Sequence, residues 1–190
     1  MINDKLLIDK ILAGTPNAFP TLIRQYQRLV CHIVFRMVPN DLDREDVCQN
    51  VFIKVYKNLA KFQFESKVST WIAKIAYNTC LNHLKKKAVP LFDDLTAPDE
   101  SIDNCVPDLY SPADYAAKKD LSSKLQAEIE KLPLQFRTIL TLYHLDEMRY
   151  AEITEILGLP EGTVKSYLFR ARKMLKERLM SQYQQEDLCY

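Results

Sequence analysis

The stretch YAEITEILGLPEGTVKSYLFRARKMLKERL, residues 150–179, decides the fold of the C-terminal part of this chain. Apolar residues recur every three to four positions in its first part, which predicts a short α-helix. Gly158 predicts the end of that helix, because glycine adopts the left-handed conformation without a Cβ clash. Pro160 suits the first turn of a following helix. Two helices joined by such a turn are typical of a helix-turn-helix, whose second helix enters the major groove of DNA.

The second half of this stretch predicts a basic amphipathic helix. Its apolar side is formed by Val164, Leu168, Ala171, Leu175 and Leu179. Hydroxyl and cationic side chains lie on the other sides, and cations far outnumber acids between Glu161 and Met180. A patch this basic in a chain of net charge +1 indicates a polyanionic partner. Spacing alone also allows an ordinary helical hairpin with a solvated charged face.

The composition of the whole chain predicts an all-α protein made of two small helical domains. Of its 190 residues 47% are hydrophobic, only three are glycine, and long stretches have helical periodicity. The N-terminus is too polar for a signal peptide, and no apolar run approaches the ~20 residues of a membrane span. Five scattered cysteines without a C-x-x-C pair, and histidines outside metal-ligand spacing, predict free thiols, no metal site and no cofactor. We therefore expect a soluble cytoplasmic protein.

Three helices are predicted before residue 60. They span residues 3–13, a segment that follows Asn17 as a plausible N-cap, and a stretch from about Asp43 to Leu59. The third helix has an apolar row, and its opposite face carries Glu45, Asp46, Gln49 and Asn50. Acids in a first turn are commonly just favourable partners of the helix dipole. A polar, hydrogen-bonding face also suits a reversible protein interface.

The segment KFQFESKVSTWIAKIAYNTCLNHLKKK, residues 61–87, combines aromatic and cationic side chains. Ser69 or Thr70 is predicted to cap its helix, and Phe62 and Phe64 lie in the short loop before that helix. Aromatic residues interleaved with cations are typical of single-stranded nucleic-acid binding, because bases stack on the rings and phosphates pair with the amines. This segment is therefore a second candidate for contact with nucleic acid.

Residues 88–114 are rich in proline and acidic residues and contain no lysine or arginine. This composition predicts a flexible acidic linker rather than a packed element. The linker divides the chain into an N-terminal domain, residues 1–87, and a C-terminal domain, residues 115–190. A helix at about 113–131 and another beginning at Pro133 are the expected core partners of the helix-turn-helix.

Three motifs in this order resemble the extracytoplasmic-function sigma factors of bacterial RNA polymerase, a group of the sigma-70 family. The C-terminal stretch, with Gly162-Thr163-Val164-Lys165-Ser166 followed by Arg170-Ala171-Arg172, resembles region 4. Asp46 and Gln49 match the pattern of region 2.2, and the pattern FxFxSKxSTWIxxIAxN resembles regions 2.3 and 2.4. The resemblance covers residues 4–180.

The resemblance implies three sets of contacts. Core polymerase would be bound at its β′ clamp helices by Asp43, Glu45, Asp46, Gln49 and Asn50. The minus-ten element would be melted and held by Phe62, Phe64, Lys67, Ser69, Thr70, Lys74, Asn78 and Asn82. The minus-thirty-five element would be read by Thr163, Lys165, Ser166, Tyr167, Arg170 and Lys173. Tyr167 stands where the family often has arginine, and Asn50 replaces a usual acid.

The function that the resemblance implies is that of a sigma factor, which directs promoter-specific initiation by core RNA polymerase. Its implied partners are the β′ clamp helices and β flap of the polymerase, promoter DNA, and an anti-sigma factor. An enzyme is disfavoured, because the sequence has no glycine-rich phosphate loop, no metal-spaced cluster and no Ser–His or Cys–His pairing. One alternative is a stand-alone helix-turn-helix regulator, which leaves the Phe62–Asn78 pattern and the Asp43–Leu59 face without a purpose. The other is a decoy that binds polymerase but not DNA.

Overall fold

The structure, a computed structural model, describes residues 4–87 and 125–182 of the chain. Within these residues every regular element is helical and no β-strand occurs, which confirms the all-α prediction for this part of the chain. The linker predicted at 88–114 lies outside the described residues. So does most of the helix predicted at 113–131, of which residues 125–130 are described and helical.

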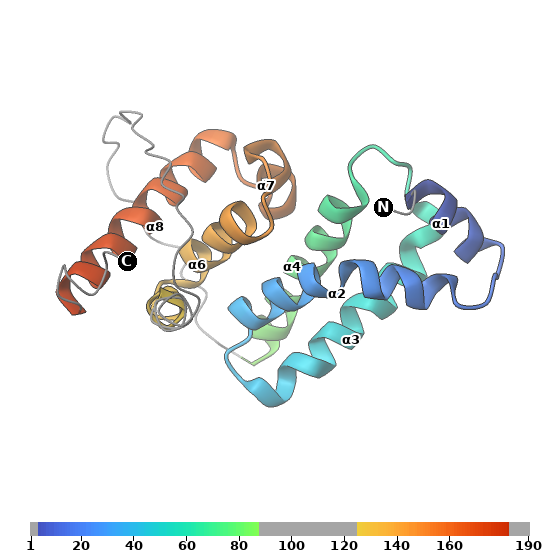
Figure 1. Cartoon of the computed structure of the whole chain (residues 1–190), viewed down its shortest axis with the longest axis horizontal. Helices are drawn as coiled ribbons and strands as arrows, with labels where there is room; N and C mark the ends of the chain where they lie inside the picture. The colour runs from blue at the N-terminus through green and yellow to red at the C-terminus, as the bar shows by residue number, and fades with distance from the viewer. Residues whose placement is uncertain (1–3, 88–124, 183–190) are drawn as a thin grey trace, which may run out of the picture.

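The N-terminal domain is a bundle of four helices joined by short connections (Figure 1). These are α1 (Asp4–Leu12), α2 (Ala18–Met37), α3 (Asp41–Asn58) and α4 (Val68–Lys86), with a 3-10 turn, η1 (Leu59–Lys61), after α3. Helices α2, α3 and α4 pack on one another pairwise, and α1 packs on α2. Their apolar faces form a core that includes Leu22, Val30, Ile33, Val51 and Ile72. Burying each such side chain contributes about 1.5–3 kcal/mol relative to leaving it exposed.

The starts of the helices differ in detail from the prediction. Helix α3 begins earlier than expected because the Asn40 side chain accepts a hydrogen bond from the backbone N–H of Leu42 at 3.1 Å. Asn17 does occupy the N-cap of α2, in a left-handed conformation with φ 61°, but its side chain makes no capping bond. The capping role predicted for Ser69 or Thr70 is wrong. Both lie inside the first turn of α4, whose N-cap is Lys67.

The described part of the C-terminal domain is built from α6 (Leu134–Leu140), a π-helical turn, η2 (Thr141–Leu145), α7 (Tyr150–Leu157) and α8 (Glu161–Gln182). Helices α7 and α8 form the predicted helix-turn-helix. Gly158 ends α7 at φ 69°, a conformation that an L side chain would strain. The core partner α6 was predicted to begin at Pro133, which is its N-cap. The apolar side chains that these helices bury together include Phe136, Ile139, Leu142, Ile153, Val164 and Leu168.

A buried carboxylate, that of Glu128, forms ion pairs that link α8 to the helical segment at residues 125–130. Glu128 is only 1% exposed, and its carboxylate accepts bonds from Lys131 and from Arg178, whose Nε lies 3.4 Å away. The bond from Lys131 in particular, together with that from Arg178, holds the pKa of Glu128 below its ordinary value of 4.5 against the opposing effect of burial. The acid is therefore ionised and paired at neutral pH.

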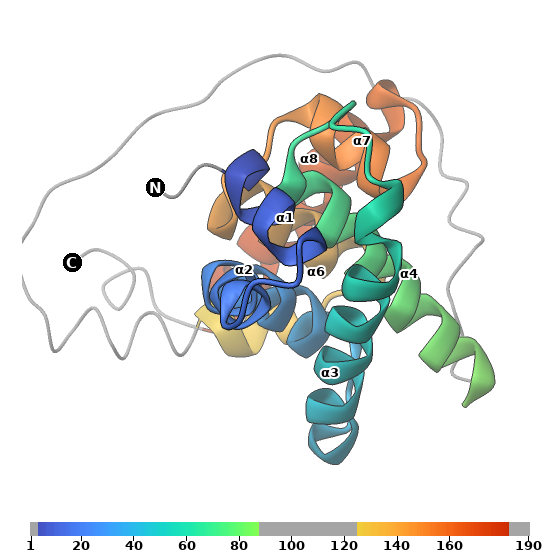
Figure 2. The same ribbon diagram turned by 90° about the vertical axis from the view of Figure 1, so that its right-hand side faces the viewer.

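The two domains pack directly against each other. Helix α7 packs on α4, and α6 and η2 pack on α2, as the two views agree (Figures 1 and 2). Among the described residues three ion pairs cross this interface, and in each the N-terminal domain supplies the cationic or imidazole partner and the C-terminal domain the carboxylate. The pairs are His32–Asp146 at 2.8 Å, Arg36–Glu130 at 3.1 Å and Lys67–Glu152 at 2.8 Å.

Candidate nucleic-acid interface

The loop that joins η1 to α4 presents aromatic rings beside the start of α4. The ring centroid of Phe62 lies 4.8 Å from that of Trp71 and 4.7 Å from that of Phe64, so the three rings form one cluster. Trp71 and Phe62 are partly buried against the core, while 42% of Phe64 is exposed. Phe64 also has φ 58°, a conformation that non-glycine residues adopt rarely. Strained backbone of this kind is concentrated at functional sites, and here it holds an aromatic side chain in solvent.

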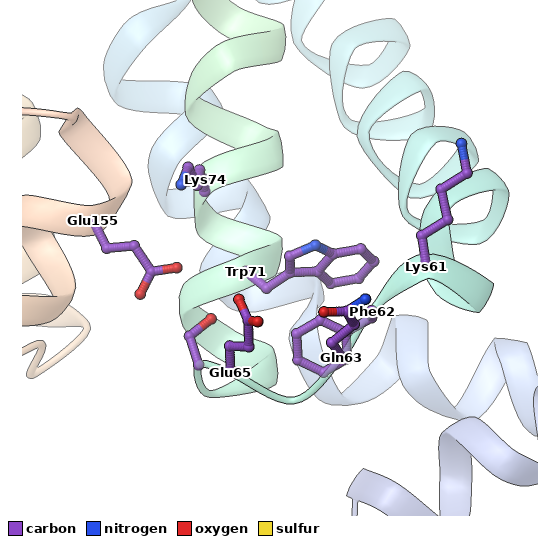
Figure 3. A pocket seen from close by; sticks show the side chains of 8 residues that line it. Lys61, Phe62, Gln63, Glu65, Trp71, Lys74 and Glu155 are labelled. Atoms are coloured by element: carbon purple, nitrogen blue, oxygen red, sulfur yellow. The ribbon is translucent and has the colours of Figure 1, made fainter.

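A pocket of about 230 Å³ opens beside this cluster (Figure 3). Its walls come from the loop, the first turns of α4 and one residue of α7, namely Lys61, Phe62, Gln63, Glu65, Ser66, Trp71, Lys74 and Glu155. Figure 3 shows Glu155 extending from α7 toward α4. A cavity with aromatic and cationic walls can hold a base by stacking while an amine pairs with the phosphate.

Of the residues predicted to contact the minus-ten element, Phe62 and Lys74 line this pocket, and Asn78 and Asn82 continue from it along α4. Lys67 and Ser69 line a second cavity, together with Asp146 and Glu152. Lys74, Asn78 and Asn82 are exposed and follow one another at intervals of four, which places them on one face of the helix. Ser69 is half-buried in the first turn of α4. Thr70 lies elsewhere: it is only 1% exposed, and its hydroxyl has no hydrogen-bond partner among the described residues.

The face of α3 predicted to bind polymerase is largely open. The exposed members of this face are Glu45, Asp46, Gln49 and Asn50. Asp43 differs, because its carboxylate bonds to Lys87 and lies 3.5 Å from His83 Nε2, both near the end of α4. The bond from Lys87 holds the pKa of Asp43 below its ordinary value. In this structure Asp43 therefore joins the start of α3 to the end of α4.

Helix α8 carries the predicted recognition residues. Lys165 and Lys173 are exposed, and Thr163, Ser166 and Arg170 are half-buried along the same helix.

The predicted recognition residues Lys165 and Tyr167 contact side chains of their own domain. The Lys165 ammonium is 2.7 Å from Glu161 Oε1, whose bond raises the lysine pKa, and 5.5 Å from the ring centroid of Tyr150. The ring of Tyr167 packs edge-on against Phe136 with centroids 5.6 Å apart. Tyr167 therefore contributes to the packing of its own domain and leaves only part of its surface to DNA.

Two features of the surface were not foreseen from the sequence. The first is the contact of Glu152 with Lys67 and the place of Glu155 in the wall of the loop pocket, because residues so distant in sequence leave no local signal of contact. The second is an apolar pocket of about 320 Å³ in the C-terminal domain. It is lined by Leu125, Ile129, Leu140, Thr141, His144, Leu145 and Leu175. Leu125 and Leu145 in its wall are exposed, and exposure is not visible in a sequence.

Other kinds of site find little support in the described residues. These residues contain no cluster of three or more His, Cys, Asp or Glu side chains that could hold a metal ion. Cys31, Cys48 and Cys80 are free thiols, as predicted. Burial chiefly raises the pKa of the Cys80 thiol to about 12, which makes it unreactive at neutral pH. None of the described helices is long and apolar enough to cross a membrane.

Comparison with known proteins assigns both parts of the chain to families. Residues 22–89 match the family described as Sigma-70 region 2, and residues 122–175 match Sigma-70, region 4. SigW of Bacillus subtilis, an ECF RNA polymerase sigma factor, is 33% identical over 179 residues, which cover 92% of this chain and 96% of that protein. The RNA polymerase sigma-H factor of Pseudomonas aeruginosa is 32% identical over 180 residues, 93% of each chain. The ECF sigma-E factor of Escherichia coli is 32% identical over 182 residues, 94% of this chain and 95% of its own.

Solved structures share the fold. CnrH in complex with the cytosolic domain of CnrY matches with a TM-score of 0.67 and 19% identity, over 95% of this chain and 99% of that chain. The sigma factor RpoE in complex with the anti-sigma factor NepR from Bartonella quintana matches with a TM-score of 0.63 and 20% identity, over 88% of this chain and 99% of that chain. At these identities the likeness concerns the fold.

Proposed function

Because the chain belongs to the extracytoplasmic-function sigma factors of the sigma-70 family, we propose that its three exposed polar faces divide the work of promoter-specific initiation among them. As a sigma factor the protein acts with RNA polymerase on promoter DNA. The observation that carries the division of labour is spatial: the α3 face, the loop pocket with α4, and the exposed side of α8 are separate surfaces built from the three motifs. We assign residues 1–87 and 115–190 to the two DNA-contacting domains and 88–114 to the acidic linker between them.

The α3 face is proposed to bind core polymerase. Its side chains are exposed acids and amides, which form hydrogen bonds and ion pairs, and the exposed apolar residues Leu42 and Ile53 lie on the same helix. Such a surface suits a partner that is released and exchanged, as non-obligate interfaces are polar at their rims. The residues proposed to make direct contact are Glu45, Asp46, Gln49 and Asn50. Asp43 is proposed to act on the same interface by fixing the first turn of α3 through Lys87.

The loop pocket and α4 are proposed to capture a base of the minus-ten element and hold the neighbouring single strand. Flipping a base out of a duplex costs a few kcal/mol, and stacking on an aromatic ring returns about 1–3 kcal/mol per base. Phe62 and Phe64 supply rings, Lys74 supplies a cation at the pocket, and Lys67 supplies one at the start of α4, where it lines a second cavity. Ser69, Asn78 and Asn82 are the polar side chains next to this path, and Thr70 reaches it only if the first turn of α4 rearranges.

Helix α8 is proposed to read the minus-thirty-five element in the major groove. Lys165 and Lys173 would pair with phosphates, while Thr163, Ser166 and Arg170 would reach base edges. Tyr167 is proposed to support the helix through Phe136 and to add an apolar contact with DNA.

Two protein partners are proposed for the remaining surfaces. The apolar pocket around Leu140 and Leu145 fits an apolar segment of the polymerase β flap. The two solved complexes named above hold CnrY and the anti-sigma factor NepR, and we propose that an anti-sigma factor also controls this chain in the cytoplasm. No catalytic activity of its own is proposed.

Transcription from genomic DNA by core polymerase, with and without this protein, tests the proposed function. We expect protein-dependent transcripts, and we expect that replacing Asp46 with lysine removes them. Core binding without any transcript would instead indicate a decoy. Specific duplex binding by the free protein, without core binding, would indicate a stand-alone regulator.

A further inference from the structure

Two cations of α8 lie on a pair of stacked tyrosine rings. Tyr143, in η2, and Tyr150, the first residue of α7, stack with ring centroids 5.2 Å apart and ring planes at 26°. The ammonium of Lys165 lies 5.5 Å from the ring centroid of Tyr150, and the guanidinium carbon of Arg172 lies 5.1 Å from that of Tyr143. Both distances are within the range of a cation–π contact. The four side chains therefore form one row, in the order Lys165, Tyr150, Tyr143, Arg172.

The π-helical turn η2 places Tyr143 in this row. The backbone N–H of Asp146 donates to the carbonyl of Thr141 at 3.1 Å, five residues back instead of four. Turns of this kind occur frequently at functional sites. Here Tyr143 packs on the first residue of α7, and the next residue, His144, bonds to Arg172 of α8. The turn thus links the two helices of the helix-turn-helix.

Each cation of the row also has a polar partner. The Nε–H of Arg172 donates to His144 Nε2 at 3.3 Å. Desolvation of the imidazole, and then the charge of Arg172, lower the pKa of His144 below its ordinary value of 6.5, so the ring is neutral at neutral pH and can accept this bond. The ammonium of Lys165 lies 2.7 Å from Glu161 Oε1. Both cations are therefore held by a ring and by an acceptor.

The two cations lie on one edge of the recognition helix. They are seven residues apart, which places them on the same side of α8 and about 10.5 Å apart along its axis. The residues assigned above to base edges, Thr163, Ser166 and Arg170, follow one another at intervals of three and four on an adjacent side. A helix that turns one side to the bases of the major groove has its flanking sides next to the phosphates.

We propose that Tyr143 and Tyr150 are positioning residues of the DNA-reading surface, and that Arg172 is a further phosphate contact. The inference rests on the proposed function of α8. The stacked rings hold Lys165 and Arg172 two turns apart on one edge of the helix, and each cation pairs with a phosphate. Without the rings these long side chains are ordered only when DNA binds, and the lost side-chain freedom weakens binding.

The test is a double-mutant cycle in the full chain, made of Tyr150→Leu, Lys165→Ala and the variant with both changes. The probe is a fluorescein-labelled 30-base-pair duplex of mixed sequence, because phosphate contacts do not depend on sequence. Its anisotropy is titrated with each protein at low salt. A control cycle combines Tyr150→Leu with Lys173→Ala, because Lys173 is an exposed cation of α8 outside the row. Circular dichroism melting checks that every variant is folded.

We expect Tyr150→Leu to weaken binding about two- to fivefold, the range of a cation–π contact at an exposed site. Lys165→Ala should weaken it by at least as much. The variant with both changes should bind no more weakly than Lys165→Ala, because the ring has lost the cation that it positions. In the control cycle the two losses should multiply. Tyr150→Phe keeps the ring and should bind as the wild type does.

A second cycle, of Tyr143→Leu with Arg172→Ala, should show the same coupling and decides the question if Tyr150→Leu is unfolded. Losses that multiply in the cycles of the row, as they do in the control, would overturn the inference. So would a loss for Tyr150→Phe as large as that for Tyr150→Leu, or failure of the wild type to bind the duplex. Transcription by core polymerase separates this failure from failure of the proposed function. Protein-dependent transcripts together with multiplying losses would leave the sigma-factor function intact and remove only the positioning role.

Discussion

Replacement of Phe64 by alanine is expected to impair promoter opening without unfolding the protein. The ring is 42% exposed, and its contact with Phe62 has centroids 4.7 Å apart. Loss of such an aromatic pair costs about 0.5–1.5 kcal/mol of folding stability. Loss of base stacking costs about 1–3 kcal/mol in the open complex, which corresponds to about a five- to 150-fold loss in its equilibrium constant. The functional loss should therefore exceed the loss of stability.

A matched control is available in the same domain. Tyr56 is 57% exposed and packs edge-on against Phe19 with centroids 4.9 Å apart, so Tyr56→Ala removes a similar aromatic pair away from the loop pocket. The assay is permanganate footprinting of unpaired thymines on a promoter used by the holoenzyme, at saturating core polymerase. The reasoning is refuted if Phe64→Ala opens the promoter as well as Tyr56→Ala does, with both variants equally folded.

Three further predictions concern the other surfaces. Asp46→Arg should weaken binding to core polymerase at least about tenfold with an unchanged melting temperature, because a misplaced charge at an interface costs several kcal/mol. A fluorescence titration with core polymerase would measure this affinity. Unchanged affinity would contradict the assignment of the α3 face to polymerase binding. Lys173→Ala should weaken holoenzyme binding to duplex promoter DNA about equally for all sequences. It should also reduce the slope of log affinity against log salt concentration by about one, because one phosphate contact is lost. An unchanged slope would place the lysine away from phosphate. Because Lys131 and Arg178 hold the pKa of Glu128 below 4.5, its contribution to stability is present above that pH and lost as the pH falls through the lower folded pKa. Glu128→Gln should therefore reduce stability at neutral pH and flatten the acid limb of the stability curve, and a melting series from neutral to acid pH that gives parallel curves would exclude this role.

Local sequence signals were enough to predict the α-helices of the N-terminal domain, α6 and the helix-turn-helix. Gly158 has the left-handed conformation that its position after an apolar stripe predicts. The buried row of α8, with Val164 and Leu168, follows from spacing alone. Helix starts were less predictable. Several polar residues near the start of α3 could act as its N-cap, and only the folded backbone shows that Asn40 does so.

The candidate site was predictable in residue type but not in accessibility. Phe64 was expected in the loop before α4 and lies there, but of the adjacent hydroxyl residues Ser69 and Thr70 the first is half-buried and the second is buried. The rotation of α4 about its own axis decides which side chains of its first turn are buried. The sequence constrains this rotation only through the sum of many core contacts. The pairing of Lys67 with Glu152 could not be predicted at all, because it depends on how two separately folding domains meet.

The measurement that tests the central claim most directly is selection from a promoter library randomised upstream of the start site, transcribed by core polymerase with this protein. We expect the selected transcripts to share two sequence blocks at a fixed separation, one for each domain. Substitution of Ser166 should change the preference in the upstream block alone, and Phe64→Ala should relax the downstream block alone. A single shared block, or transcripts that do not depend on the protein, would contradict the account of two DNA-contacting domains acting with polymerase.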